Sequence, residues 1–264
     1  MNTFKRPVII LLFLLSCPVS AEVISVDTPN KGSDPTLTFY MPGQNSRALI
    51  LLLPGGEGML NLKPGMTELN AGVVPILKRL TDPSRTSGQY DVVAMDSPYS
   101  LKVSRGGGGA RGTSDHMERI ESVAKYYTEK TRLPIILMGH SNGTLSASWF
   151  VRYVQEKNAG DLINGLVLSS SRNEVSISPP MNMPVIVMHH AQDGCQNTSY
   201  STDRSRYEKV VSFNKSLTLF ITITTGSGVP GNACESGFHM LFDADDEVSR
   251  KLDENLTKVL FVNH

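Results

Sequence analysis

The sequence predicts an α/β protein whose core is a mostly parallel sheet of eight strands with helices on both faces. Short runs rich in Val, Ile and Leu alternate along the chain with amphipathic segments, an order typical of parallel sheets. The run Ala48–Leu53 is apolar at every position, as expected of a strand that is covered on both faces. Turn residues bound each of these runs, which indicates that each one is a separate strand.

The predicted strands fall into an N-terminal pair and a longer series. Glu22–Val26 and Thr36–Met41 are separated by a segment rich in Pro, Gly and Ser, which indicates a turn between two short strands. The predicted strands that follow are Ala48–Leu53, Tyr90–Met95, Leu133–Met138, Ile163–Leu168, Pro184–Met188 and Leu217–Ile223.

Amphipathic helices are predicted between the later strands. Ser114–Lys130 begins at a candidate N-cap, Ser114 or Asp115, and repeats apolar residues at helical spacing. The same spacing predicts helices over Gly143–Gln155 and Asp245–Val262. No repeat and no linker divides the chain, so residues 22–264 are expected to form a single domain.

Composition and charge exclude several classes of protein. Hydrophobic residues make up 40% of the 264 residues and charged residues 19%, which is typical of a globular chain. The 25 basic and 25 acidic residues balance, so the sequence does not indicate a nucleic-acid-binding surface or a polybasic membrane patch.

The first 21 residues are predicted to be a cleavable signal peptide. Lys5 and Arg6 precede a short apolar run, and Val19-Ser20-Ala21 provides small residues at a cleavage site. A membrane anchor would need about 20 apolar residues. Cys17 suggests a lipoprotein as a minor alternative, but Pro18 follows it directly. We therefore expect a secreted or periplasmic protein that is not inserted in a membrane after cleavage.

Removal of the signal leaves Cys195 and Cys234, which are expected to pair in an oxidising compartment. The segment His189-His190-Ala191-Gln192-Asp193-Gly194-Cys195 also gathers potential metal ligands. Successive strand residues point to opposite faces, however, and a disulfide would remove the thiolate that zinc requires. We expect a disulfide, no metal and no cofactor; two unpaired thiols are the remaining alternative.

The motif Gly139-His140-Ser141-Asn142-Gly143 joins a predicted buried strand directly to a predicted helix. In that context Gly-x-Ser-x-Gly is typical of a nucleophile elbow, a turn so tight that the two glycines must lack side chains. The turn would place the Ser141 hydroxyl at a helix N-terminus, where negative charge is favoured. The alternative is an ordinary turn. With this motif the sequence resembles the α/β-hydrolase family, over nearly the whole chain after the signal.

The resemblance implies a three-layer α/β-hydrolase fold and an oxyanion hole. In the family one donor is the N–H after the nucleophile, here that of Asn142, and the other comes from the loop after the third strand. That loop is Pro54-Gly55-Gly56-Glu57-Gly58, which offers the N–H of Gly56 or of Glu57. It is similar to the His-Gly-Gly-Gly motif of esterases but has Pro54 and Glu57 at two of the positions.

The resemblance also implies a base and an acid in the chain order Ser, Asp, His. His239 lies between the last predicted strand and the last helix, where the family has its base. The strand near Met188 extends over Met183 to His190, and Asp193 follows in the turn at its carboxyl end, where the family has its acid. A disulfide between Cys195 and Cys234 would then connect the acid turn to the base loop.

The expected activity is that of a serine hydrolase acting on an ester or related acyl bond of a small-molecule substrate. An acyltransferase, a peptidase and a non-catalytic binding protein on the same fold are alternatives. The short segment between Leu168 and Pro184 leaves no room for a sizeable lid. The glycine-rich run Arg105–Gly112 is expected to be a solvated loop near the site; its arginines could also meet an anionic group.

Overall fold

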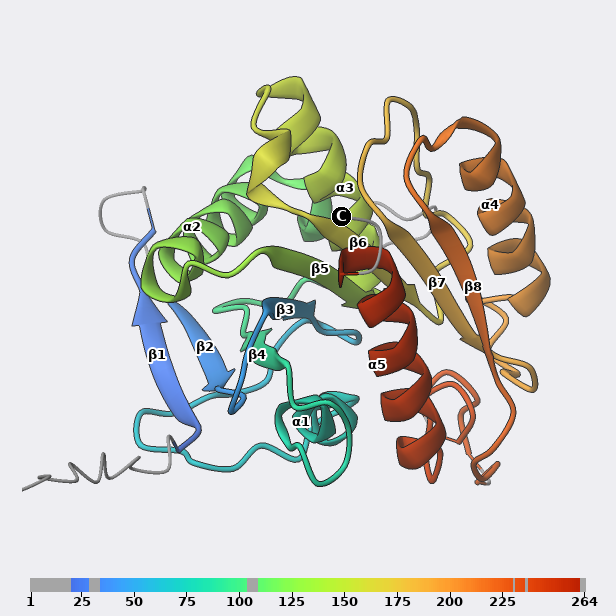
Figure 1. The fold of residues 1–264 in the computed structure, drawn as a ribbon, viewed down its shortest axis with the longest axis horizontal. Helices are drawn as coiled ribbons and strands as arrows, with labels where there is room; N and C mark the ends of the chain where they lie inside the picture. The colour runs from blue at the N-terminus through green and yellow to red at the C-terminus, as the bar shows by residue number, and fades with distance from the viewer. Residues whose placement is uncertain (1–19, 29–33, 104–108, 230, 236, 262–264) are drawn as a thin grey trace, which may run out of the picture.

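The computed structural model describes residues 20–28, 34–103, 109–229, 231–235 and 237–261. Its centre is one eight-stranded sheet with the strand order β1-β2-β4-β3-β5-β6-β7-β8 (Figure 1). The predicted signal peptide lies outside the described residues, apart from Ser20 and Ala21. The strands are β1 (Glu22–Val26), β2 (Thr36–Met41), β3 (Ala48–Leu53), β4 (Tyr90–Met95), β5 (Ile135–His140), β6 (Gly165–Ser169), β7 (Val185–His190) and β8 (Thr218–Ile223).

The sheet is mostly parallel, as the sequence predicts. All neighbouring strands in the series β4-β3-β5-β6-β7-β8 pair in parallel. β2 is antiparallel to both of its neighbours, β1 and β4. β5 begins at Ile135 rather than Leu133, because Pro134 lacks the N–H that a strand interior donates. The other strand ends differ from the predicted ones by two residues or fewer.

Helices cover both faces of the sheet. The helices are α1 (Val74–Lys78), α2 (Ser114–Thr131), α3 (Gly143–Glu156), α4 (Tyr200–Phe213) and α5 (Asp245–Phe261), with short 3₁₀ turns at Arg79–Thr81, Ala110–Gly112 and Gly160–Leu162. α2, α3 and α4 contribute to one apolar cluster against the sheet, and α1 and α5 contribute to the other (Figure 1). This is the three-layer arrangement that the sequence predicts.

The N-terminus of α2 differs from the predicted one. Thr113, rather than Ser114 or Asp115, is the N-cap, since it has extended backbone angles and its side chain accepts a hydrogen bond from the N–H of His116 at 3.4 Å. Ser114 is already the first helical residue. The local pattern Thr-Ser-Asp offers three suitable caps, and only the backbone path selects one.

The segment between β6 and β7, residues 170–184, contains neither a helix nor a strand. The fold therefore lacks a lid domain over the carboxyl edge of the sheet. None of the helices in the described part of the chain is long and apolar enough to cross a membrane.

Candidate active site

Ser141 lies in a tight turn between β5 and α3 and has a left-handed backbone, with φ of 52°. A Cβ on Gly139 would lie 2.6 Å from the Gly143 carbonyl oxygen, and a Cβ on Gly143 would lie 2.0 Å from that of Leu53. Both positions therefore exclude any side chain. The close approach also brings the end of β3, and the loop that follows it, against the start of α3.

The side chains of Ser141, His239 and Asp193 form a hydrogen-bonded chain. His239 Nε2 lies 2.9 Å from Ser141 Oγ, and His239 Nδ1 lies 2.9 Å from Asp193 Oδ2. The three residues come from the turn after β5, the loop between β8 and α5, and the turn after β7. With a proton on Nδ1, His239 donates to Asp193 and presents the Nε2 lone pair to the Ser141 hydroxyl.

Asp193 is buried and receives more than one hydrogen bond. Its Oδ1 accepts from the N–H of Cys195 at 2.8 Å, and Thr198 Oγ1 lies 3.2 Å from its Oδ2. Burial by itself would raise the pKa of Asp193, but hydrogen bonds from His189 and His239 outweigh it and hold the pKa below its ordinary value. Asp193 is therefore a carboxylate at neutral pH.

His140, the residue before Ser141, is buried beside the base loop. Its ring centre lies 5.6 Å from that of His239, and its Nδ1 lies 3.1 Å from Ser169 Oγ. Burial lowers the pKa of His140 to about 3, so the ring is neutral at physiological pH. Neutral His140 is therefore a neighbour of the site and not a second base, as the order of Ser, Asp and His along the chain predicts.

The loop after β3 lies next to Ser141. A Cβ on Gly55 would lie only 3.0 Å from Ser141 Cβ. Asn142 Nδ2 donates to the Gly56 carbonyl at 2.8 Å, which connects the turn of the serine to this loop. Among the described residues, the backbone N–H groups of Gly56, Glu57 and Asn142 have no protein acceptor.

Arg111 is an exception to the predicted solvated glycine-rich loop, in which Gly109 and Gly112 are exposed and residues 105–108 lie outside the described residues. Its side chain is 1% exposed, and its Nη2 donates to the carbonyls of Pro54, Gly55 and Gly56 at 3.3, 3.4 and 3.0 Å. Burial lowers its pKa to about 10, which leaves the guanidinium charged at neutral pH. Arg111 therefore holds the loop after β3 through these hydrogen bonds. Arg105 lies outside the described residues.

Cys195 and Cys234 form a disulfide, as the sequence predicts. Cys195 lies two residues after Asp193, and Cys234 lies in the loop that carries His239. The bond therefore joins the acid turn to the base loop.

The two histidines that precede Asp193 lie on opposite faces of the sheet. His189 contacts Asp193, whereas His190 Nε2 donates to the Thr225 carbonyl at 2.9 Å. No group of three or more potential metal ligands gathers anywhere in the described segments.

Sequence reasoning missed several residues of the site. Thr198 Oγ1 lies 3.1 Å from His239 Nδ1. Asp203 and Arg206, both on α4, are buried, and Asp203 contacts His189 of β7. The α4 segment is mostly polar, and the spacing of Asp203 and Arg206 permits an i, i+3 ion pair. His264, which follows the last predicted helix, lies outside the described residues.

Comparison with known proteins identifies the fold. No family model and no curated protein matches the chain. An α/β serine hydrolase homologue from Coxiella burnetii is 14% identical, with a TM-score of 0.59 over 91% of this chain and 100% of that one. A dienelactone hydrolase from Anabaena variabilis is 12% identical, with a TM-score of 0.57 over 91% of this chain and 98% of the other.

An acylaminoacyl peptidase from Pyrococcus horikoshii is 11% identical, with a TM-score of 0.58. That match covers 91% of this chain and 41% of the longer peptidase. The chain therefore has the α/β-hydrolase fold.

Proposed function

We propose that this protein is a serine hydrolase that cleaves an ester or a related acyl bond through an acyl-enzyme intermediate. The observation that carries the proposal is the hydrogen-bonded chain from Ser141 through His239 to Asp193. A serine hydroxyl becomes a useful nucleophile when an imidazole takes its proton and a carboxylate orients that imidazole. The contacts of His239 with Ser141 and with Asp193 support the proposal.

In the proposed reaction Ser141 Oγ attacks the substrate carbonyl carbon while His239 Nε2 takes the hydroxyl proton. Asp193 holds the ring in the tautomer with a proton on Nδ1 and stabilises the imidazolium that forms. The same proton then passes to the leaving group, which departs as an alcohol and leaves an acyl-serine. Water, activated by His239, attacks the acyl-serine and releases the carboxylic acid.

The negative charge on the tetrahedral intermediate needs donors that are already in place. We assign the first to the N–H of Asn142, the N-cap residue of α3, and the second to Gly56 or Glu57. The lack of any other acceptor for these three N–H groups in the described part of the chain supports the assignment. Arg111 supports the assignment further, because its guanidinium donates to the Gly56 carbonyl and so holds the loop next to Ser141.

The absence of a lid favours small or surface-accessible esters as substrates. With residues 170–184 free of helix and strand, the carboxyl edge of the sheet has no separate domain to cover a long acyl chain. A peptidase and an acyltransferase would use the same side chains, and one of the structural neighbours is an acylaminoacyl peptidase. A binding protein on this fold would not need the aligned hydroxyl and imidazole.

We also propose that the chain is exported and that residues 22–264 form its single folded domain. The disulfide between Cys195 and Cys234 supports export, since such bonds persist in oxidising compartments. The sequence of residues 1–21 supplies the signal.

Hydrolysis of p-nitrophenyl esters of increasing chain length tests the proposed function. The wild type is expected to cleave the short esters fastest, and Ser141→Ala is expected to lower kcat by about 10⁵-fold or more. Ser148→Ala is the matched control on α3, because that hydroxyl donates only to the Leu145 carbonyl. Equal rates for wild type and Ser141→Ala, or no hydrolysis of any acyl substrate, would contradict the proposal.

A further inference from the structure

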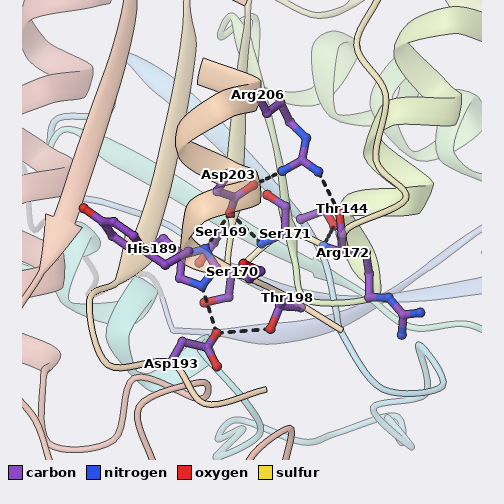
Figure 2. Close-up of polar contacts among 12 residues, drawn as sticks. Thr144, Ser169, Ser170, Ser171, Arg172, His189, Asp193, Thr198, Asp203 and Arg206 are labelled. Atoms are coloured by element: carbon purple, nitrogen blue, oxygen red, sulfur yellow. Dashed lines mark hydrogen bonds and ion pairs between the residues drawn. The ribbon is translucent and has the colours of Figure 1, made fainter. Parts of the chain in front are cut away.

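His189 lies between two buried carboxylates. Its Nε2 is 3.0 Å from Asp193 Oδ2 and its Nδ1 is 2.6 Å from Asp203 Oδ2, and the side chains of all three residues are fully buried. Figure 2 shows Asp193, from the turn after β7, and Asp203, from α4, on opposite sides of the ring. Asp193 Oδ2 is the same atom that faces His239 Nδ1. His189 is therefore connected to the proposed base, His239, through Asp193.

Hydrogen-bond chemistry restricts the protonation state of this group. An ionised carboxylate can only accept, and a neutral imidazole donates from one ring nitrogen and carries a lone pair on the other. A neutral His189 would therefore point a lone pair at one of the two carboxylate oxygens. The contacts are satisfied only if one extra proton is present, either on the ring or on one of the carboxyl groups.

The surroundings of Asp203 keep the extra proton away from that carboxyl group. Asp203 Oδ1 pairs with the guanidinium of Arg206, and its Oδ2 accepts from the Ser171 N–H at 2.9 Å. Burial lowers the pKa of Arg206 to about 10, so the guanidinium keeps its charge at neutral pH. Arg206 is itself fixed, because it donates to the carbonyls of Val175 and Arg172 at 3.1 and 2.9 Å.

We propose that His189 is an imidazolium held between Asp193 and Asp203, and that it is a positioning residue which sets the orientation and the effective charge of Asp193 toward His239. The inference depends on the proposed function, in which Asp193 orients His239. Charges then alternate along the buried row from Asp193 through His189 and Asp203 to Arg206. Such alternation removes the cost of burying any single one of them unpaired.

The other charged or titratable groups around His189 do not replace this role. From α4 the ring of Tyr200 meets it edge-on, with 5.7 Å between ring centres. From β5 the buried His140 is neutral, and the adjacent His190 faces the opposite side of the sheet. His239 reaches His189 only through Asp193. Asp193 and Asp203 are thus the anions in direct contact with the ring among the described residues.

The proposal predicts a shift in the pH dependence of hydrolysis. A fixed positive charge beside Asp193 reduces the stabilisation that this carboxylate gives to protonated His239. His239 therefore loses its proton, and can act as the base, at a lower pH. In His189→Gln the charge is gone, and the acidic limb of the kcat/KM profile for p-nitrophenyl acetate is expected to move up by about one pH unit. At pH 6 this is a loss of about tenfold relative to the wild type, with a smaller change on the alkaline plateau.

Two further variants keep the test decisive. Asp203→Asn preserves the shape of the side chain, removes the second anion and is expected to move the acidic limb in the same direction. His190→Gln is the matched control, because that neighbouring histidine does not contact either carboxylate, and its acidic limb is expected to coincide with that of the wild type. Circular dichroism and thermal unfolding identify any variant that has not folded.

Nuclear magnetic resonance of the full chain with ¹⁵N-labelled histidine reads the protonation state directly. Protons on both ring nitrogens of His189 at pH 8, and on only one in Asp203→Asn, are the expected result. A neutral His189 in the wild type would overturn the inference, as would folded variants with an unmoved acidic limb. If the wild type hydrolyses no ester, the proposed function fails, and the resonance measurement still decides the charge of His189.

Discussion

Gly55 shows how closely the loop after β3 approaches the proposed nucleophile. Its missing side chain lets the loop backbone pass within van der Waals distance of Ser141, since an added Cβ would lie 3.0 Å from Ser141 Cβ and 3.2 Å from the His140 carbonyl oxygen. Contacts this short require the neighbouring atoms to move by a few tenths of an ångström. The N–H groups of Gly56 and Glu57, which follow in the chain, would move with them.

Substitution of Gly55 by alanine therefore tests the oxyanion assignment without removing a polar group. Gly55→Ala is expected to lower kcat for short esters by roughly 10- to 100-fold, because donors displaced from the developing oxyanion stabilise it less. KM is expected to change less than kcat, since the loop acts mainly in the transition state.

Gly160→Ala is the matched control for that experiment. A Cβ at Gly160 meets nothing within 4 Å, so this variant carries the same chemical change at a position remote from the site. Gly55→Ala with wild-type kcat, measured on a folded protein, would show that the loop does not supply an oxyanion donor.

Some residues of the site could be predicted from the sequence and others could not. Ser141 belongs to a pattern whose neighbours along the chain define its geometry, so the local sequence is informative. Arg111 and Asp203 acquire their surroundings from segments far away in the chain, namely the loop after β3 for Arg111 and the end of β7 for Asp203. A charged residue usually lies at the surface, and only the tertiary structure reveals that these two do not.

At the scale of elements, the disulfide connects the two segments that carry Asp193 and His239. Cys195 and Cys234 are separated by 39 residues, so their bond restricts the unfolded chain considerably. Replacement of both by alanine is expected to lower the free energy of unfolding by about 4 kcal/mol at most, from the loss of loop closure. It is also expected to lower kcat, because the turn and the loop are then joined only by side-chain contacts.

Urea unfolding and ester hydrolysis of the double variant measure the two effects. Reduction of the wild type with dithiothreitol is the parallel control and should produce the same changes. A double variant as stable and as active as the wild type would show that the bond contributes neither to folding nor to the alignment of Asp193 with His239.

Elements with a clear apolar period were predicted well, whereas the short helix α1 and helix α4 were missed. The apolar run of β3 and the apolar face of α2 both recur at the spacing of their structure, so their positions could be predicted closely. Helix α4 buries only Asp203, Arg206 and Val210, which leaves little apolar periodicity in its sequence. It packs against the sheet through partly buried aromatic residues such as Tyr207 and also through the polar cluster around His189, and hydrophobic patterns cannot reveal the second mode.

At the scale of the whole molecule, two buried histidines determine how stability depends on pH. Burial lowers the pKa of both His116 and His140 to about 3, from the value of 6.5 that an exposed histidine has. Between these values the unfolded chain binds protons that the folded chain does not, so stability rises with pH. It is therefore lost as the pH falls below about 6.5, by about 1.4 kcal/mol per pH unit for each histidine.

Asp193 affects the stability of the fold at a lower pH than the two histidines. Its pKa is below the ordinary value of 3.8, because the hydrogen bonds from His189 and His239 outweigh burial, so its contribution is complete above that pH and is lost only at stronger acidity. Urea unfolding at pH 7.5, 6.5 and 5.5 measures the contribution of the buried histidines, and His116→Gln is expected to reduce the slope between pH 6.5 and 5.5. Equal stability at pH 7.5 and 5.5 would contradict the assignment of two neutral, buried histidines.

The central claim is that Ser141 is a nucleophile activated by His239, and covalent labelling tests it most directly. The full chain is treated with a fluorophosphonate, and the modified residue is identified by mass spectrometry of its peptides. The account predicts a single adduct on Ser141, absent in Ser141→Ala and formed much more slowly in His239→Ala. A folded wild type that takes up no label, or one that is labelled at another residue, would contradict it.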